Sequence, residues 1–447
     1  MTNPPKIASN FAHGTASGKW SLATLLILSL LIPVYFEIAG LRLSATRILL
    51  LVAFVPQLIA IVRDPSIRFR STDVFLLAYG FWVFLTLFVH HGTPIIPYAG
   101  ITIVELLGGY LIARASIRSP DDFRKMIRVY VSVIVLILPF ALLETFTNRN
   151  LFQEVFGTIL PAFVKPDNLV ARWGLERAMA SFEHPILFGL FCSIIFASAF
   201  YVYRFDSRKV FFVLSAIFLA TFSAMSSAPI LSILVQSSLL VWAGLTSSKW
   251  RLLIGLIVTG YVSIDLLSNR TPITILINYI TFDSGTAWTR IHIWRYGSAE
   301  MWSHPFVGIG MNNWTRPQWL TSSVDNFWLV NGMRYGAVGV LFLILGLSLS
   351  LAGIKRSKNL CHEDADLRRG YVISLVSLYL TLATVHVWGD TSVIVMFYIG
   401  AGIWFYDSPR TASELSKAGN SRPSSIQHRE RRYTRQERLH RPTDSKK

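Results

Sequence analysis

Arginine side chains stand in two long polar stretches of a chain that is otherwise mostly apolar, and they are the residues best suited to chemistry. The first stretch, 147–184, contains Arg177, and the second, 269–325, contains Arg290. Loops longer than about 15 residues usually carry a function. A guanidinium is a planar fork of donors that fits phosphate and carboxylate groups. Both stretches are therefore candidates for binding an anionic substrate.

A helix is expected within the second stretch, because residues 286–302 contain no helix breaker except Gly297. Such a helix would place Arg290, Trp294 and Met301 along one stripe. An arginine that shares a face with aromatic rings suits an anionic group on a sugar or on a lipid carrier. The alternative is a helix that lies at the membrane surface, where tryptophan and arginine are ordinary.

Arg334 lies seven residues into an apolar run that follows Asp325. An unpaired charge in the hydrocarbon costs at least ~2.5 kcal/mol, so an intramembrane arginine that faces the protein interior is a candidate for function. The structural alternatives are a side chain that snorkels to the headgroups and an ion pair. The candidate partners for such a pair are Glu37, Glu105, Glu144 and Asp265. For the polar turn 386–390, and for Glu105 within its own apolar run, a structural role is the favoured interpretation.

Membrane-spanning helices must position these residues. Of the 447 residues, 52% are hydrophobic and 15% are charged, whereas a soluble domain has about 25% charged residues. Twelve apolar runs are long enough to cross a ~30 Å hydrocarbon core as helices. We place them at about 20–38, 46–62, 74–90, 95–113, 127–146, 186–203, 210–226, 228–246, 251–268, 327–353, 370–387 and 391–406. The predicted fold is an all-α polytopic bundle of about 12 transmembrane helices.

The predicted organisation follows from these runs. It comprises an N-terminal segment 1–19, helices 1–5 within 20–146, the loop 147–184, helices 6–9 within 185–268, the loop 269–325, helices 10–12 within 326–406 and a tail 407–447.

Lysine and arginine predict the orientation, because they favour the cytoplasmic side of a membrane. With the N-terminus inside, the inner segments hold most of the 42 Lys and Arg residues. Both termini are therefore predicted to be cytoplasmic, with the two long loops on the other side. The net charge of +17 then lies mainly inside, where contact with anionic lipid is favoured over nucleic acid. The tail from Ser408 is rich in polar and charged residues and is expected to be disordered.

Cysteine and metal chemistry are not expected. Cys192 falls in a predicted span and Cys361 in a cytoplasmic loop, so they should not pair. Two cysteines cannot build a disulfide framework or a cysteine metal site. No group of His, Asp and Glu residues has convincing spacing for metal ligands. We expect no metal and no cofactor.

Three patches together resemble the superfamily of O-antigen ligases and polymerases, the Wzy-like and WaaL-like membrane enzymes that include exopolysaccharide polymerases. The segment 177–185 is similar to the family's arginine followed by a Gly/Ser-Phe-x-x-Pro stretch. Residues 290–294 with 304–310 are similar to its R-x-x-x-W…P-x-x-G-x-G stretch. Asn326, followed after nine residues by Gly336, is similar to its H-N-x9-G motif. The resemblance covers roughly residues 170–345.

The resemblance implies a GT-C-like bundle that transfers a glycan from undecaprenyl diphosphate to an acceptor hydroxyl on the periplasmic face of the bacterial inner membrane. It implies that Arg177 and Arg290 neutralise the departing diphosphate with help from Arg334. It also implies that Asp325 accepts the proton of the attacking hydroxyl, with inversion and without a metal. Alternative bases are Glu176, Glu183 and His292. The expected substrate contacts are Arg334, Trp294, Asn326, His292, Glu183 and Arg295.

Asp325 stands where the family usually has histidine. That favours a polymerase, whose acceptor is a second lipid-linked repeat unit and whose partners would include membrane lipids and a chain-length regulator. The alternatives are a ligase that transfers the glycan to lipid A core, a lipid-linked-sugar flippase or other transporter, and a membrane-embedded peptidoglycan polymerase. A transporter often shows two related halves, and no convincing internal repeat is found.

Overall fold

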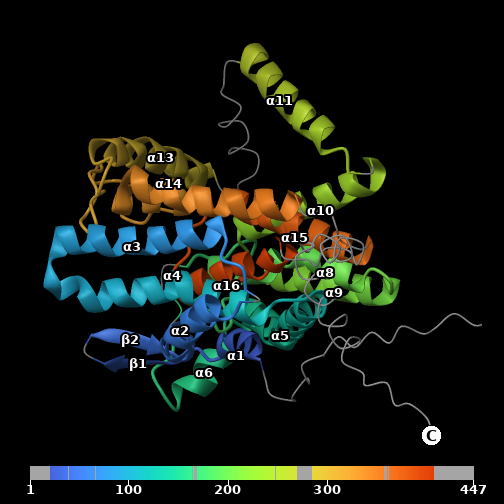
Figure 1. Ribbon diagram of the computed structural model, residues 1–447, viewed down its shortest axis with the longest axis horizontal. Helices are drawn as coiled ribbons and strands as arrows, with labels where there is room; N and C mark the ends of the chain where they lie inside the picture. The colour runs from blue at the N-terminus through green and yellow to red at the C-terminus, as the bar shows by residue number, and fades with distance from the viewer. Residues whose placement is uncertain are drawn as a thin grey trace, which may run out of the picture.

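The computed structural model is a bundle of helices with one small β-hairpin (Figure 1). It describes residues 21–38, 40–65, 67–163, 165, 169–246, 248–268, 284–356, 360 and 362–406. The predicted N-terminal segment 1–19, the predicted tail 407–447 and residues 269–283, at the start of the predicted loop 269–325, lie outside the described residues.

Eight helical segments are long and apolar enough to cross a membrane, which makes the chain a polytopic helical membrane protein. They are α2 (Ala45–Arg63), α3 (Ser71–His91), η1 with α4 (Thr93–Ile95 and Ile96–Ser116), α5 (Pro120–Thr147), α7 with α8 (Pro185–Ile194 and Phe196–Tyr203), α10 (Ser227–Thr246), α11 (Trp250–Leu267) and α14 (Phe327–Arg356). Each of them coincides with a predicted apolar run. The count of twelve spans stays a prediction.

The other four predicted runs form helices that are shorter or more polar. They are α1 (Leu22–Ser29), α9 (Ser207–Ser223), α15 (His362–Thr381) and α16 (Gly389–Gly400). Helix α9 has 17 residues and α16 has 12. The first two turns of α15 are rich in charged side chains. Short helices also lie in the two long loops, as α6 (Leu151–Gly157) and α13 (Ser284–Ser303), and η2 (Ile403–Tyr406) follows α16.

The predicted helix 20–38 is wrong in its second half. After α1 the chain forms strand β1 (Tyr35–Ile38), which pairs with antiparallel strand β2 (Leu41–Ser44). Pro33 has no backbone N–H and disfavours helix in the residue before it. The next residues are β-branched or aromatic, which suits a strand. Gly40, with φ of 76°, supplies the turn.

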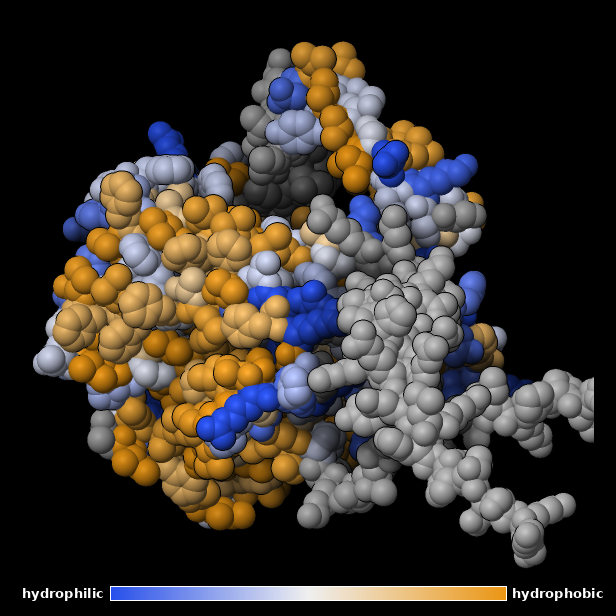
Figure 2. Space-filling model, in the orientation of Figure 1, coloured by the Kyte–Doolittle hydropathy of each residue, from blue (hydrophilic) through white to orange (hydrophobic). Residues whose placement is uncertain are grey.

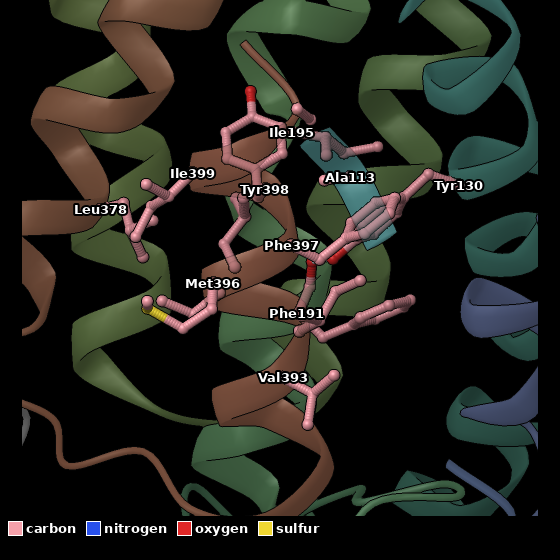
Figure 3. Packing of buried hydrophobic residues seen from close by; sticks show 14 of the residues in the cluster. Ala113, Tyr130, Phe191, Ile195, Leu378, Val393, Met396, Phe397, Tyr398 and Ile399 are labelled. Carbon is pink, nitrogen blue, oxygen red and sulfur yellow. The ribbon is translucent and has the colours of Figure 1, made fainter. Parts of the chain in front are cut away.

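Close packing of α4 on α16 forms the centre of the bundle (Figure 3). A Cβ atom at Gly109 of α4 would overlap the carbonyl oxygen of Val393 in α16, so this contact requires glycine. Around this contact, Tyr130 of α5 stacks on Phe191 of α7 with ring centroids 4.5 Å apart. These contacts fix α16, and with it the loop that precedes it.

The outer surface of the bundle is apolar, as expected for helices that face lipid. Figure 2 shows a broad hydrophobic face over α3 and α4. Phe81 of α3 is 67% exposed and Val52 of α2 is 72% exposed. Helix α11 has no buried residue. One end of the bundle brings together the last residues of α3, α5 and α15 and the first residues of α7, α10 and α14. We call this end of the bundle the site end.

Candidate active site

A tight turn in the first long loop presents Arg172 at the site end. Arg172 and Leu175 exchange two backbone hydrogen bonds of 2.9 and 3.0 Å. Trp173 and Gly174 between them both have positive φ, of 54° and 74°, as a type I′ turn requires. The Arg172 guanidinium donates from Nη1 to the carbonyl oxygen of Met225 at 2.6 Å, which ties the turn to the start of α10.

The next residues run as a buried, extended segment that fixes Arg177. Ala178 donates its N–H to Ser223 at the end of α9, at 2.9 Å. Ala180 donates to the Glu144 carboxylate at the end of α5, at 2.9 Å. Ser181 donates its hydroxyl to the carbonyl of Leu30 beyond α1. Because the segment is held from three sides, the Arg177 side chain, which is 8% exposed, has a defined position.

The second long loop holds Arg290 on α13, which packs along the first turns of α14. Ile293 of α13 is buried in a cluster with Leu329 and Met333 of α14. At Gly297 a Cβ atom would lie 2.8 Å from the Leu329 side chain, so the two helices approach closely there. The predicted helix over 286–302 is confirmed, since α13 covers this range.

The glycine-rich turn that follows α13 is built into a break in α14. Gly336 has φ of 71° and ψ of 175°, which interrupts the helix. Ile309 and Gly310 donate their N–H groups to the carbonyl oxygens of Met333 and Arg334 at 2.8 and 2.9 Å. Gly308 also has positive φ, and a Cβ there would lie 2.5 Å from the Arg334 backbone. The break and the turn together fix Arg334.

Two histidines at the end of α3 support the same turn. His91 accepts at Nε2 from the N–H of Met311 at 3.0 Å. His90 places Nε2 3.3 Å from the carbonyl oxygen of Val307. In the structure these side chains connect α3 to the second loop.

Asp325 ends the second loop immediately before α14. The Asn326 side chain accepts from the N–H of Leu329 at 2.9 Å and caps the helix. Phe327 donates its N–H to the carbonyl of Leu382 beyond α15, at 2.9 Å. These two bonds fix the backbone next to Asp325. They also give Asn326, predicted to contact substrate, a structural role.

Arg172, Arg177, Arg290 and Asp325 form the charged group that we call the arginine cluster. Asp325 is electrostatically coupled to Arg177 and to Arg290, and Arg172 is coupled to both arginines. In the part of the chain that the structure describes, no carboxylate lies within 4.0 Å of either Arg177 or Arg290. The Nε atoms of Arg177 and Arg290 are buried, and neither has a hydrogen-bond partner among the described residues.

Burial sets the ionisation of this cluster. It raises the pKa of Asp325, while Arg290 and Arg177 act in the opposite direction. Burial and then Arg172 lower the pKa of Arg177 to about 10, against the pull of Asp325. That value still leaves Arg177 cationic at neutral pH. Arg177 and Arg290 are two cations that share one described anion, Asp325, so they attract an additional anion.

His184 borders the arginine cluster as an uncharged group. It caps α7, where Nδ1 accepts the N–H of Ile186 at 3.1 Å. Burial, Arg177 and Arg172 lower its pKa to about 4, in that order of size. The imidazole is therefore neutral at pH 7. Because Nδ1 accepts a hydrogen bond, the proton of the neutral ring resides on Nε2.

A pocket of about 90 Å³ lies next to the arginine cluster, between α3, α4, α14 and the α15–α16 loop. Its wall includes Arg334, His386 and Trp388. Trp388 connects it to the first loop, because its Nε1 donates to the Glu183 carboxylate at 2.7 Å. Glu183, an alternative base in the sequence, is thus held by Trp388.

The remaining predicted contacts lie away from the arginine cluster. Trp294 is 57% exposed, and Arg295 is exposed beside it. Arg290 is directed inward, so it does not share an environment with Trp294, although both lie on α13. His292 packs against Trp319, with ring centroids 5.0 Å apart. Glu176 lies 3.3 Å from the Lys165 amine.

The structure also identifies residues, and pairings between residues, that the sequence did not single out. Arg172 had no motif around it, and only its spacing from Arg177 could have drawn attention to it. Arg47 of α2 and Glu105 of α4 form an ion pair of 2.5 Å. The carboxylate of Asp390 accepts from the Ser44 hydroxyl at 2.9 Å and lies near that pair. Long-range pairs of this kind leave no local pattern in a sequence.

Within the described ranges, no three His, Cys, Asp or Glu side chains lie close enough together to hold a metal ion. In the described site, the arginine side chains are the groups that can bind an anion. Comparison of the sequence with protein-family models finds no match, and comparison with curated proteins finds no significant match. The functional argument that follows is built on the geometry of the arginine cluster.

Proposed function

We propose that this protein is a membrane glycosyltransferase of the polysaccharide-polymerase type. It transfers a glycan from undecaprenyl diphosphate to a hydroxyl of another lipid-linked repeat unit. One observation carries the proposal. The Arg177 and Arg290 guanidinium groups face a single carboxylate, that of Asp325, and their Nε atoms are buried. Among the described residues, these Nε atoms have no hydrogen-bond partner and no carboxylate lies within 4.0 Å of either arginine. Such groups are suited to a diphosphate.

The proposed reaction is a single displacement at the anomeric carbon of the donor. The acceptor hydroxyl oxygen attacks that carbon while Asp325 takes up the hydroxyl proton. The bond from the anomeric carbon to the diphosphate oxygen breaks, and the electron pair leaves with the diphosphate. Arg177 and Arg290, helped by the charge of Arg172, stabilise the developing negative charge. The anomeric centre is inverted.

The environment of Asp325 supports its role as the base. Its pKa is raised by burial, which moves it towards the range in which a general base is effective. The neighbouring arginines keep the carboxylate form available. His184 is neutral at pH 7 and carries its proton on Nε2, so it can donate a hydrogen bond without adding charge.

The proposed location follows from the distribution of basic residues. The loops opposite the site end are the basic ones, and they are proposed to be cytoplasmic. The arginine cluster then faces the periplasm of a bacterial cell, where lipid-linked repeat units are assembled into polysaccharide.

The experiment uses purified protein in nanodiscs with an undecaprenyl-diphosphate-linked oligosaccharide, no other acceptor, and EDTA. A ladder of longer lipid-linked glycans is expected by gel or mass spectrometry, lost in Asp325→Asn. Arg149→Ala is the matched control, because this arginine of the same loop is exposed and pairs only with Glu154 among the described residues. Transfer only after lipid A core is added would identify a ligase. Inertness of folded protein with both acceptors would favour a transporter.

A further inference from the structure

The pocket beside Arg334 is separate from the arginine cluster although the two adjoin. Asp325 is coupled to Arg290 and Arg177, whereas Arg334 is coupled to His386. The two sites meet at Trp388, whose ring centroid lies 6.0 Å from that of His184 on one side and 6.0 Å from that of His386 on the other. Trp388 therefore lies between the first long loop and this pocket.

Arg334 brings a positive charge to the pocket that no described carboxylate neutralises. Among the described residues, none of the four acidic residues that the sequence offered as partners of Arg334 lies within 4.0 Å of its guanidinium. Glu37 pairs with Arg42 at 3.0 Å, and Glu105 pairs with Arg47 at 2.5 Å. The Arg334 side chain does hydrogen-bond to Tyr335, and that bond leaves other donors of the guanidinium for a ligand.

His386 adds a second polar group without a charge. Burial, and after it Arg334, lowers the pKa of His386 to about 3, so the ring is neutral at pH 7. Its Nδ1 atom is buried and has no hydrogen-bond partner among the described residues. The wall also includes the aromatic rings of Tyr98, Tyr335 and Trp388, which carry a polar end, and the carboxylate of Glu105, which pairs with Arg47. Aromatic faces with a few convergent polar groups are suited to a sugar ring.

We propose that this pocket binds the carboxylate of an acidic sugar, such as a uronic acid, in the acceptor glycan. The inference rests on the proposed function and names its substrate class. Arg334 binds the carboxylate with its free donors, and the unpartnered nitrogen of His386 completes the contact with the same sugar.

The first test measures binding and does not require catalysis. Methyl β-glucuronide and methyl β-glucoside are titrated onto the protein in nanodiscs of neutral lipid, and binding is followed by saturation-transfer NMR. The two probes differ only in the carboxylate, so the glucuronide should bind at least about tenfold more tightly, the worth of one charge-assisted hydrogen bond. This comparison uses the unaltered chain and is not affected by a variant that fails to fold.

Variants locate the binding site. Arg334→Gln should remove the preference for the glucuronide, and Arg334→Lys should retain only part of it because the ammonium lacks the fork. Arg149→Gln, at an exposed position, should retain the full preference. If the glucuronide signal is instead lost in Arg290→Ala and kept in Arg334→Gln, the probe binds to the arginine cluster and the inference is overturned.

The second test separates this inference from the proposed function. Lipid-linked repeat units with a terminal glucuronate, or with the same sugar reduced to glucose, are offered as acceptors. The kcat/KM ratio of acidic to neutral acceptor should be about ten or more, and near one in Arg334→Gln. Polymerisation without any such preference would overturn the acidic-sugar site and leave the polymerase standing. Carboxylate binding at Arg334 without any glycan transfer would support the acidic-sugar site and overturn the polymerase.

Discussion

At the scale of single residues, the site is defined by two arginine charges, those of Arg177 and Arg290, that no carboxylate of the described residues neutralises by direct contact. Arg177 is 8% exposed and Arg290 is directed inward, yet neither has a carboxylate within 4.0 Å among the described residues. Keeping cations buried in this way costs free energy. A protein retains such an arrangement most readily where an anionic ligand supplies the missing interaction.

Substitutions at the two arginines should distinguish charge from geometry. Arg290→Ala should reduce the rate of glycan transfer by about 100-fold or more, the cost of losing a group that stabilises charge in a transition state. Arg290→Lys keeps the charge but loses the fork, so it should recover only part of that rate. Initial rates of ladder formation, with protein folding checked by size-exclusion chromatography, give the comparison. A fully active Arg290→Lys protein would show that forked phosphate contact is not needed.

The pH dependence should be set by Asp325. The base must be ionised, so activity is lost as the pH falls through the pKa of this carboxyl group. Because burial raises that pKa, the acidic limb of the kcat/KM profile should lie above the usual range of aspartate. His184 has a pKa of about 4 and should contribute no transition between pH 6 and 8. An acidic limb that is unchanged in Asp325→Glu and in His184→Ala would assign it to another group.

At the scale of elements, the decisive feature is the interlock between the glycine-rich turn and the break in α14. The turn after α13 supplies N–H groups to the carbonyls of Met333 and Arg334, and Ala337 returns a hydrogen bond of 2.7 Å to Pro305. A break leaves helix carbonyls and N–H groups without partners, and the turn provides those partners. The break therefore brings both Arg334 and the end of α13 into fixed positions.

Replacing Gly336 should disrupt the contact between the glycine-rich turn and the break in α14. Its φ of 71° disfavours any side chain, and a Cβ atom would overlap the carbonyl oxygen of Phe306. Gly336→Ala should lower the free energy of unfolding by at least about 1–2 kcal/mol and should reduce transfer activity. Gly244→Ala in α10 is the control, since nothing lies within 4 Å of that position and it should be neutral or slightly stabilising. Equal melting temperatures for the two variants would contradict the interlock.

The sequence predicted the long apolar helices well, because their signal is local and needs no partner. It also predicted α13, from an uninterrupted stretch that ends at a proline. It missed the β1–β2 hairpin, since an apolar run of this length matches a span by composition alone. The glycines 308, 310 and 336 were recognised as a pattern. The structure was required to show that Gly308 lies against the backbone of α14, Gly310 against the His90 and His91 side chains and Gly336 against Phe306.

The charged groups of the site were predictable only one at a time. Arg177, Arg290 and Asp325 were named from the sequence, and the structure places them in one electrostatically coupled group. Trp294 was expected beside Arg290 from helix periodicity. Periodicity describes one helix in isolation, and here the packing of α13 on α14 decides which side chains turn inward. Arg172 belongs to the group through a turn of positive φ that carried no recognisable motif.

At the scale of the whole molecule, the end of the bundle opposite the site is held by a buried ion pair. Arg114 of α4 donates from Nε and Nη2 to the two oxygens of Asp73 in α3, at 2.9 and 3.0 Å. Asp73 also accepts from the N–H of Arg70 at 2.7 Å and caps the start of α3. This network ties α3 to α4 at the end where each chain reversal is short.

Breaking this pair should affect stability and not chemistry. Arg114→Ala would leave the Asp73 carboxylate buried without its main partner, which typically costs about 3–5 kcal/mol. The thermal midpoint in detergent should fall clearly, while protein that remains folded at low temperature should keep its transfer rate. Arg118→Ala is the control, because that arginine is partly exposed and its bond to Asp64 should contribute little. A loss of activity in folded Arg114→Ala would mean that the two ends are coupled.

The orientation in the membrane decides whether the proposed reaction can occur, because a polymerase of lipid-linked units must expose its arginine cluster to the periplasm. The prediction rests on basic residues at the opposite end, such as Arg208 and Lys209 in the first turn of α9. Single cysteines at exposed Thr321 in the second loop and at exposed Lys209 test it, after Cys192 and Cys361 are replaced by serine. In intact cells an impermeant maleimide should label Thr321→Cys only. Both should react after the membrane is opened. Labelling of Lys209→Cys alone in intact cells would place the arginine cluster on the cytoplasmic face, where a periplasmic transfer reaction is impossible.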